Sequence, residues 1–302
     1  MVWLPGKNRD TSQIVFSAHK EDNMIEMPEA TTLAMQMNQI LIGKSIKYFG
    51  RGNKTHKFLW LNLPDDSYKT ILPGLTVNEV SSFGRSIYMH LGNHMMWWSD
   101  FGGRLLYHKP GSKLPQNSHL IWEFNDDSAL SFNMQMWGSV KLLNNSEFST
   151  KPNDETGIEP LSDQFTLSNF SAMLDEYPEK TSKGIKGFLV ATGYVTPNHI
   201  AGLGNAIVQD ILFSAKIHPK RKIMDISHNE RKNLFKAINE TVAEVTKLGG
   251  RYDEVDLFGN NGGYIRLMDN KTKDTPCIYC HTMIKKISYL GGACYICPNC
   301  QT

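Results

Sequence analysis

A chain of 302 residues and 34.2 kDa can bury two moderate hydrophobic cores, so we expect two domains and a small tail. The formal net charge is only +2, which excludes nucleic-acid binding through overall basicity and leaves local basic surfaces as the means. No apolar stretch reaches the roughly 20 residues of a membrane-spanning helix, and the N-terminus lacks the apolar core of a signal peptide. We therefore expect a cytoplasmic protein without membrane contact.

The first helix is predicted directly after a polar stretch. Residues 1–23 carry no periodicity and predict a disordered extension; alternatively, Met24 and not Met1 is the true start. From Pro28 apolar residues recur at spacings of three and four, and Gly43 ends the pattern. The apolar face of this helix consists of Ala30, Leu33, Met37, Ile40 and Leu41.

A block of short aromatic and β-branched segments follows, separated by turns rich in Gly, Asn and Asp. Strands at this density favour an antiparallel β-sandwich with the first helix at its flank, which we assign to residues 24–150. The polar segment from Asn144 to Gly157 is typical of a linker. The predicted strands are residues 46–49, 58–61, 86–91, 94–98, 119–124 and 140–143.

The pattern becomes helical after the linker, and we assign residues 158–262 to a helical domain. The predicted helices run from Ser162 or Asp163 to about Leu174, from Gly187 to Thr192, from Asn205 to Ala215 and from Ser227 to Lys247.

Four cysteines close the chain in two pairs. Two residues separate Cys277 from Cys280 and Cys297 from Cys300, and sixteen residues lie between the pairs. In a cysteine-poor chain this spacing predicts one structural zinc ion held by four thiolates, with residues 263–302 as a zinc-finger β-hairpin. The alternatives are two disulfides, or a zinc ribbon that only stabilises its own tail.

Several short motifs resemble the formamidopyrimidine-DNA glycosylase / endonuclease VIII family of base-excision repair enzymes. Residues 24–29 (MIEMPE) resemble the family's opening Met-Pro-Glu-Leu-Pro-Glu, and residues 202–205 (GLGN) resemble its Gly-x-Gly-Asn turn. Residues 159–162 (EPLS) and 217–219 (IHP) also match in order. The resemblance implies an α+β fold with an N-terminal β-sandwich, a helix–two-turn–helix domain and a C-terminal zinc finger.

The resemblance implies chemistry at the opening of the chain. The family's nucleophile is the amine of an N-terminal proline, which attacks C1′ of a flipped nucleotide to form a Schiff base, and β-elimination then cuts the strand. Ile25 holds the position of that proline, and Glu26 and Glu29 match the family's two glutamates, the first of which is its general acid/base. An alternative register makes Pro28 the nucleophile of a protein that starts at Met27.

At other positions, too, this chain lacks the residue on which the family relies. The strand lysine that donates a proton falls at Arg85, and a guanidinium cannot readily exchange a proton, although it can bind a phosphate. The zinc-finger arginine falls near Gly292. The side chains that the family inserts into the duplex fall near Phe101, Gln135 and Trp137.

The predicted DNA contacts gather in the helical region. Gly202 and Gly204 would let backbone amides approach a phosphate, and Asn205 opens the next helix. His119 is a further predicted contact, and grouped basic residues favour phosphate binding. The basic residues are Lys183, Lys186, Lys216, Lys220, Arg221, Lys222, Lys285 and Lys286.

These features favour a monomeric DNA repair glycosylase that binds and bends duplex DNA containing a damaged base or an abasic site. Because Ile25 and Arg85 replace a proline and a lysine, we expect little Schiff-base trapping by borohydride and a strict need for Glu26. The alternative is a catalytically impaired damaged-DNA-binding protein on the same fold. A third hypothesis is an RNA-associated zinc-ribbon protein.

Overall fold

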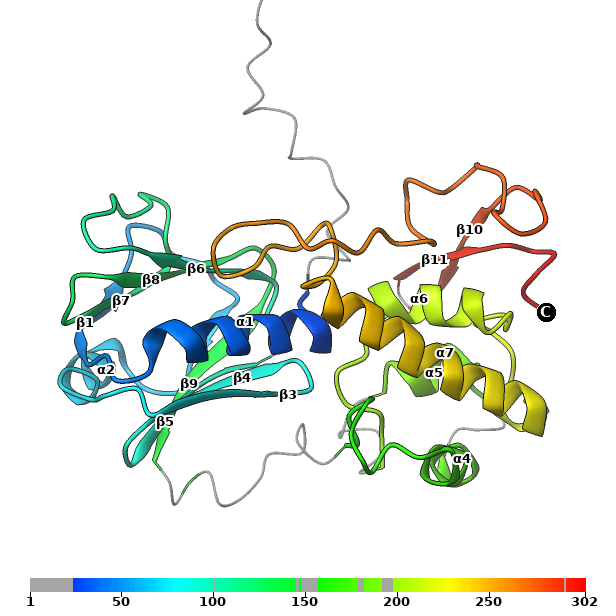
Figure 1. Ribbon diagram of the computed structural model, residues 1–302, viewed down its shortest axis with the longest axis horizontal. Coiled ribbons are helices and arrows are strands. Elements are labelled where there is room, and N and C mark those ends of the chain that lie inside the picture. Colours follow the sequence, from blue (N-terminus) through cyan, green and yellow to red (C-terminus); the bar gives the residue numbers. More distant parts are fainter. Residues whose placement is uncertain are drawn as a thin grey trace, which may run out of the picture.

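The computed structural model describes residues 24–99, 101–144, 147, 157–178, 182–191, 198–290 and 292–302. The extension predicted over residues 1–23 and most of the predicted linker lie outside these ranges. A strand-rich domain and a helical domain lie side by side, with the C-terminal hairpin on the side of the helical domain (Figure 1). No helix within the described ranges is long and apolar enough to cross a membrane.

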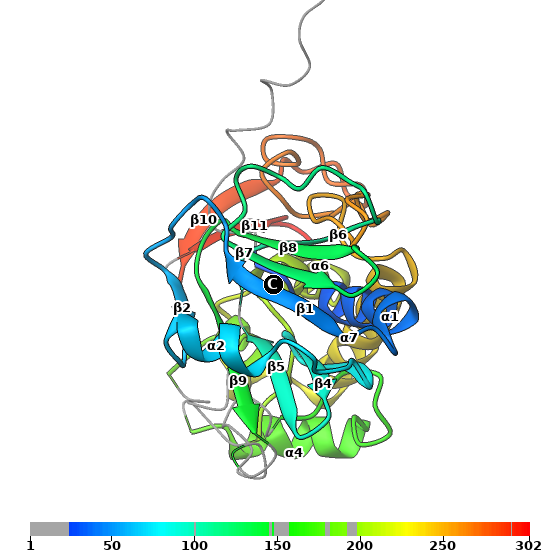
Figure 2. The same cartoon turned by 90° about the vertical axis from the view of Figure 1, so that its left-hand side faces the viewer.

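The N-terminal domain is a sandwich of two sheets, which Figure 2 shows one above the other. The four-stranded sheet is antiparallel and has the order β1-β7-β8-β6, and the five-stranded sheet has the order β2-β9-β5-β4-β3. The strands are β1 (Ile46–Arg51), β2 (Leu59–Leu61), β3 (Glu79–Phe83), β4 (Ser86–Leu91), β5 (His94–Ser99), β6 (Gly103–His108), β7 (Leu120–Phe124), β8 (Ala129–Met134) and β9 (Gly138–Asn144).

Each predicted strand is present, and β3, β6 and β8 add to them. The expectation of a wholly antiparallel sandwich is wrong for β2, which pairs with β9 in parallel. Because β1 and β2 belong to different sheets, the chain between them crosses the sandwich instead of turning back in a hairpin. A tight hairpin between β1 and β2 would have made these two strands antiparallel, but no such hairpin joins them.

Helix α1 (Met27–Leu41) runs along the N-terminal domain and begins at the boundary with the helical domain (Figure 1). It begins where Glu26 and Glu29 form a reciprocal capping box and Pro28 occupies the first turn, a position that needs no backbone N–H. The predicted apolar face is buried, with Leu33 and Met37 in the sandwich core. The helix contacts β3 and β4 on one side and the helical domain on the other. A short helix, α2 (Asp65–Ile71), packs near β1.

The helical domain contains α4 (Leu167–Glu176), α5 (Ile185–Leu189), α6 (Asn205–Ser214), the 3-10 turn η3 (Ile223–Asp225) and α7 (His228–Lys247). The predicted bounds of α6 and α7 hold to within one residue, and Ser227, the predicted first residue of α7, is its N-cap. The predicted start of α4 is corrected, because the Thr166 hydroxyl accepts from the Asn169 N–H, whereas Ser162 closes a preceding turn. Helix α5 begins two residues earlier than predicted, and Thr192 lies outside the described ranges.

A strap (residues 248–276) connects α7 to the C-terminal hairpin by way of the N-terminal domain (Figure 1). It is fastened there by two bonds, from Tyr107 N–H to the Leu257 carbonyl at 2.8 Å and from Leu257 N–H to Gln36 Oε1 at 2.9 Å. The hairpin then forms from β10 (Lys285–Tyr289) and β11 (Gly292–Ile296), and β11 contacts α6. The strap therefore links all three parts of the molecule.

Candidate functional site

A cavity of about 720 Å³ lies where the N-terminal domain, the helical domain and the hairpin meet. None of the described residues that line it carries a carboxylate, whereas Arg85 and Lys186 contribute positive charge. Such a cavity suits an anionic ligand with a flat, apolar portion. The lining consists of His56, Phe58, Arg85, Gln135, Met136, Trp137, Lys186, Val190, Gly204, Asn205, Leu290 and Gly292.

Several residues that the sequence predicts to contact DNA meet in this cavity although they come from distant parts of the chain. Gln135 and Trp137 precede β9, Arg85 lies in the β3–β4 turn, and Gly204 and Asn205 begin α6. Trp137 is 46% exposed, as a side chain that enters a duplex must be. Gly292, where the resemblance places an arginine, also faces this space but brings no charge.

Glu26 lies directly behind the cavity wall. Its carboxylate accepts hydrogen bonds from the N–H groups of Ala206 at 2.8 Å and Ile207 at 3.2 Å, at the start of α6. A Cβ atom on Gly204 would stand 2.5 Å from Glu26 Oε1, so only glycine lets the wall approach the carboxylate so closely. Burial raises the pKa of Glu26, and the opposing charge of Arg251 and the two N–H groups limit the rise.

Arg251 is the centre of a buried charge cluster that the sequence does not predict. Its side chain is 0% exposed and donates to both oxygens of Glu29, from Nε at 3.0 Å and from Nη2 at 3.2 Å. Nη2 also donates to the Met24 carbonyl at 2.7 Å, and Nη1 lies 3.8 Å from Glu26 Oε1. Glu254 lies 3.7 Å from Nη2, and burial raises the pKa of this carboxyl to about 8.

These contacts revise the role expected of Glu29. Glu26 and Glu29 are both 3% exposed, but Glu26 lies against Gly204 of the cavity wall, whereas Glu29 lies against Gly250 of the strap. The Glu29 carboxylate accepts from the N–H groups of Glu26 and Arg251 at 2.9 Å each. Glu29 therefore holds the opening of the chain and the strap together instead of meeting a substrate. It is a positioning residue for Glu26.

The backbone nitrogen of Ile25 occupies the position expected of the family's nucleophile. Ile25 is 2% exposed, and its N–H donates to the Phe101 carbonyl at 3.2 Å. In the sequence as it stands this nitrogen belongs to the peptide bond that follows Met24, and its lone pair is delocalised into the neighbouring carbonyl. A peptide nitrogen cannot form a Schiff base.

Two predicted DNA contacts are corrected by burial. Phe101 is 0% exposed and packs against Phe132 with ring centroids 5.3 Å apart, so it belongs to the sandwich core and cannot enter a duplex. His119 is 5% exposed, and its Nδ1 accepts from the Met134 N–H at 3.0 Å. Its ring supports the turn that precedes the cavity residues and does not line the cavity.

Most of the predicted basic residues are exposed, but Lys186 is buried and Arg221 forms an ion pair. Lys220 and Lys222 are exposed beside the turn that carries the half-buried Lys183, because Gly184 bridges to Lys222. Lys186 differs from expectation, since it is 3% exposed and its Nζ lies 3.1 Å from Cys294 Sγ and 3.4 Å from the Tyr289 carbonyl. The remaining predicted set, Lys216, Lys285 and Lys286, is exposed, whereas Arg221 pairs with Glu230.

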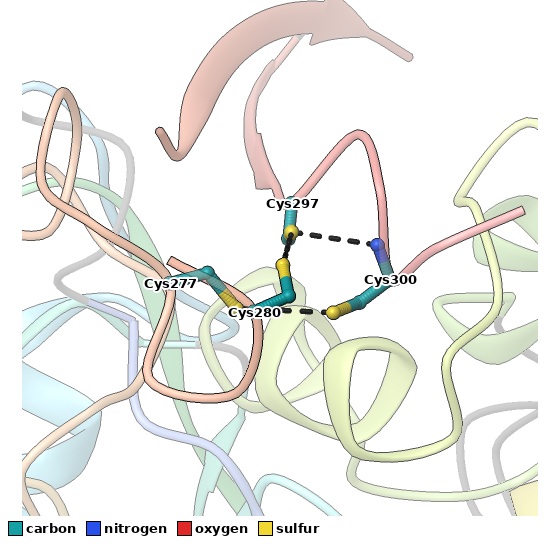
Figure 3. A group of neighbouring side chains, drawn as sticks. All are labelled: Cys277, Cys280, Cys297 and Cys300. Atoms are coloured by element: carbon teal, nitrogen blue, oxygen red, sulfur yellow. Dashed lines mark hydrogen bonds between the residues drawn. The ribbon is translucent and has the colours of Figure 1, made fainter. Parts of the chain in front are cut away.

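Four cysteine sulfur atoms lie close together in the C-terminal region (Figure 3). The Sγ atoms of Cys277, Cys280, Cys297 and Cys300 all lie within 4.8 Å of one another, with 3.9 Å between Cys277 and Cys300 and 3.4 Å between Cys280 and Cys297. Four thiolates at ~2.3 Å from a tetrahedral ion would be roughly 3.8 Å apart, so the cluster fits a metal better than two disulfides. Cys294 lies outside it.

Sequence reasoning overlooked Arg251, His56 and Phe58. Arg251 follows two glycines after a helix, where an arginine is usually solvated, and no local pattern reveals that it reaches α1. Phe58 was expected only to begin a strand and His56 was assigned no role, yet both line the cavity. The exposed aromatic residues of that segment are the one signal that could have identified it.

Comparison with known proteins agrees with this architecture. The Formamidopyrimidine-DNA glycosylase N-terminal domain matches residues 24–138, and the Formamidopyrimidine-DNA glycosylase H2TH domain matches residues 156–254. A formamidopyrimidine-DNA glycosylase of Cytobacillus firmus is 30% identical over 295 residues, covering 92% of this chain and all of the relative, and one of Listeria monocytogenes is 29% identical with the same coverage.

Solved structures share the fold. A Lactococcus lactis enzyme bound to abasic-site DNA superposes with a TM-score of 0.78 at 21% identity, covering 92% of this chain and 99% of the other. A variant of it bound to Fapy-dG DNA has a TM-score of 0.79 at 20% identity with the same coverage. The two matched domains, the full-length relatives and the shared fold show that this chain belongs to the formamidopyrimidine-DNA glycosylase family.

Proposed function

We propose that this protein is a DNA repair glycosylase that binds duplex DNA containing a damaged base, bends it and flips the damaged nucleotide into the cavity. The observation that carries the proposal is the cavity between the domains, which combines positive charge, an exposed tryptophan and the start of α6 within the family's fold. Flipping leaves a gap in the base stack, and Trp137 is the aromatic side chain placed to fill it.

The start of α6 supplies the phosphate contact in this proposal. Gly204 and Asn205 face the cavity at the N-terminus of a ten-residue helix, where backbone N–H groups and the helix dipole favour an anion. Arg85 adds a permanent positive charge across the same space. Lys220 and Lys222 extend the basic surface outside the cavity and would contact flanking phosphates.

Base removal in this protein is proposed to be hydrolytic. A water oxygen bonds to C1′ and gives up a proton, while the bond from C1′ to the base nitrogen breaks and the departing base takes up a proton. Glu26 is the group proposed to move that proton, because burial raises its pKa toward the range where an acid/base group works, and it stands immediately behind Gly204. The peptide nitrogen of Ile25 takes no part.

The test uses a duplex with one Fapy-dG, the lesion found with a structural neighbour, and a duplex with one abasic site. We expect base release that yields strand cleavage only after alkali, and no borohydride-trapped complex. Glu26→Gln should abolish release, whereas Glu240→Gln, an exposed change of equal charge, should not. Efficient trapping on abasic DNA would contradict the hydrolytic route.

A damaged-DNA-binding protein without turnover is the second candidate. It is favoured by the same two departures, a peptide nitrogen at Ile25 and a guanidinium at Arg85. In that case lesion-containing duplex is bound more tightly than undamaged duplex, but no base is released over long incubation.

The four cysteines are proposed to hold one zinc ion. All four positions of a tetrahedral site are filled by protein sulfur, so the ion would brace the hairpin and take no part in chemistry. Backbone N–H groups of Tyr279 and Cys300 lie 3.4 Å from Cys277 Sγ and Cys297 Sγ, which favours the thiolate forms. We place such a protein in the cytoplasm, with the chromosome.

A further inference from the structure

Three exposed aromatic side chains form what we term the aromatic edge (Phe58, Trp60 and Trp137). They are 43%, 52% and 46% exposed. The parallel pairing of β2 with β9 brings them together, because Leu59 lies opposite Gly138 and the Gly138 N–H donates to the Phe58 carbonyl at 3.1 Å. Nothing in the proposed function so far uses Phe58 or Trp60.

The rings share one face of the sheet. Leu59 points into the core, so its neighbours Phe58 and Trp60 point outward, since side chains alternate along a strand. Their ring centroids lie 6.3 Å apart at 62°. Phe58 and Trp137 both line the cavity, and Trp60 continues the same surface away from it. The aromatic edge therefore begins in the cavity and leads out across the N-terminal domain.

A lysine and a histidine ring lie beside the aromatic edge. Lys57 Nζ lies 4.6 Å from the centre of the Phe58 ring, and His56 stands 6.0 Å from the same ring. The described lining of the adjoining cavity contains no carboxylate. Aromatic faces interleaved with positive charge are the combination that binds unpaired nucleotides, because bases stack on the rings while the charges meet phosphates.

A duplex with one flipped nucleotide does not offer a free base face to each of the three rings. Flipping one nucleotide opens one gap, which Trp137 can fill, while every other base remains stacked on its neighbours with both faces covered. Phe58 and Trp60 then have no base to contact, although exposed apolar clusters of this kind usually mark a binding surface. Unpaired bases beside the lesion do offer free faces.

We propose that the aromatic edge binds unpaired nucleotides next to the lesion, so that the preferred substrate is damage in single-stranded or locally melted DNA. This inference rests on the proposed function and names its substrate class. The strand leaves the cavity past Trp137, and successive bases stack on Phe58 and Trp60.

The experiment measures binding of one oligonucleotide carrying a stable abasic analogue, tetrahydrofuran, as a single strand, within a bubble, and in a perfect duplex. Phe58→Ala and Trp60→Ala should each weaken binding to the single strand and the bubble about tenfold, because each removes a stacking partner. Trp60 does not line the cavity, so Trp60→Ala should change binding to the perfect duplex less than twofold. Trp60→Phe keeps a ring and should retain most of the affinity.

Phe258→Ala is the matched control, since Phe258 is 48% exposed on the strap, outside the cavity lining. It should leave all three affinities unchanged, and circular dichroism should show every variant folded. Equal losses on single strand and duplex in Trp60→Ala would overturn the inference while leaving the proposed function intact. Tighter binding of the same sequence as RNA, or a wild-type dimer that Trp60→Ala dissociates, would also overturn it. A wild-type protein that binds no damaged DNA would instead refute the proposed function.

Discussion

Replacement of Arg251 by methionine is the sharpest test of how this site is held together. Methionine fills much of the same volume, so the change removes the charge and its hydrogen bonds more than the packing. The bonds lost are those from the guanidinium to Glu29 at 3.0 and 3.2 Å and to the Met24 carbonyl at 2.7 Å. The bond from the backbone N–H of residue 251 to Glu29 at 2.9 Å can persist. Glu26 and Glu29, each 3% exposed, would then lack their counter-ion.

The expected loss of stability is large. Removing one partner of a buried ion pair typically costs ~3–5 kcal/mol, because the remaining charge stays buried without compensation. We therefore expect Arg251→Met to lower the free energy of unfolding by about 4 kcal/mol at pH 8, measured by urea unfolding followed by circular dichroism. Arg231→Met breaks a pair with Asp175, which is 63% exposed, and should cost under ~1 kcal/mol.

The stability lost in Arg251→Met should also depend on pH. A carboxyl whose pKa is raised by folding binds more protons in the folded state, so stability falls as pH rises from its unfolded pKa, 4.5, through its folded pKa. Glu254, with a folded pKa of about 8, already gives the wild type this slope between pH 4.5 and 8. The charge of Arg251 limits the rise in the pKa of Glu26, so without Arg251 the pKa of Glu26 should rise further and add to this slope, at up to ~1.4 kcal/mol per pH unit for each additional proton bound.

The difference in free energy of unfolding between Arg251→Met and the wild type should therefore be smaller at pH 5.5 than at pH 8. A deficit below ~1 kcal/mol at pH 8, or one that grows as the pH falls, would refute the reasoning that Arg251 neutralises buried carboxylates.

Two further predictions concern the hairpin and the basic surface. Cys280→Ser should remove most of the zinc found by metal analysis and weaken DNA binding, while near-ultraviolet circular dichroism of the sandwich tryptophans stays unchanged; freshly purified wild type without zinc would contradict the site. Lys220→Ala and Lys222→Ala should weaken binding to all duplexes similarly and each reduce the slope of log K against log salt by about 0.9, and a wild-type affinity independent of salt would exclude phosphate contacts.

The family and its catalytic departures could be recognised from the chain alone because they reside in short, contiguous motifs. The opening residues 24–29 and the turn at 202–205 are adjacent in sequence, and the comparisons confirm the family. Helices α1, α6 and α7 were predictable because their apolar periodicity and caps are local properties of the chain. The cysteine pairs were predictable because metal-ligand spacing is itself a sequence pattern.

Only the tertiary structure decided which side chains meet. Arg251 reaches Glu29 across 222 positions of sequence, and burial of a charge depends on partners that no local pattern names. Phe101 looked like a wedge and is core, Lys186 looked solvated and is buried, and Phe58 looked like an ordinary strand residue and stands beside Trp137. In each case the outcome depends on how sheets and domains pack, because burial and contact are set by the partner surface and not by the residue itself.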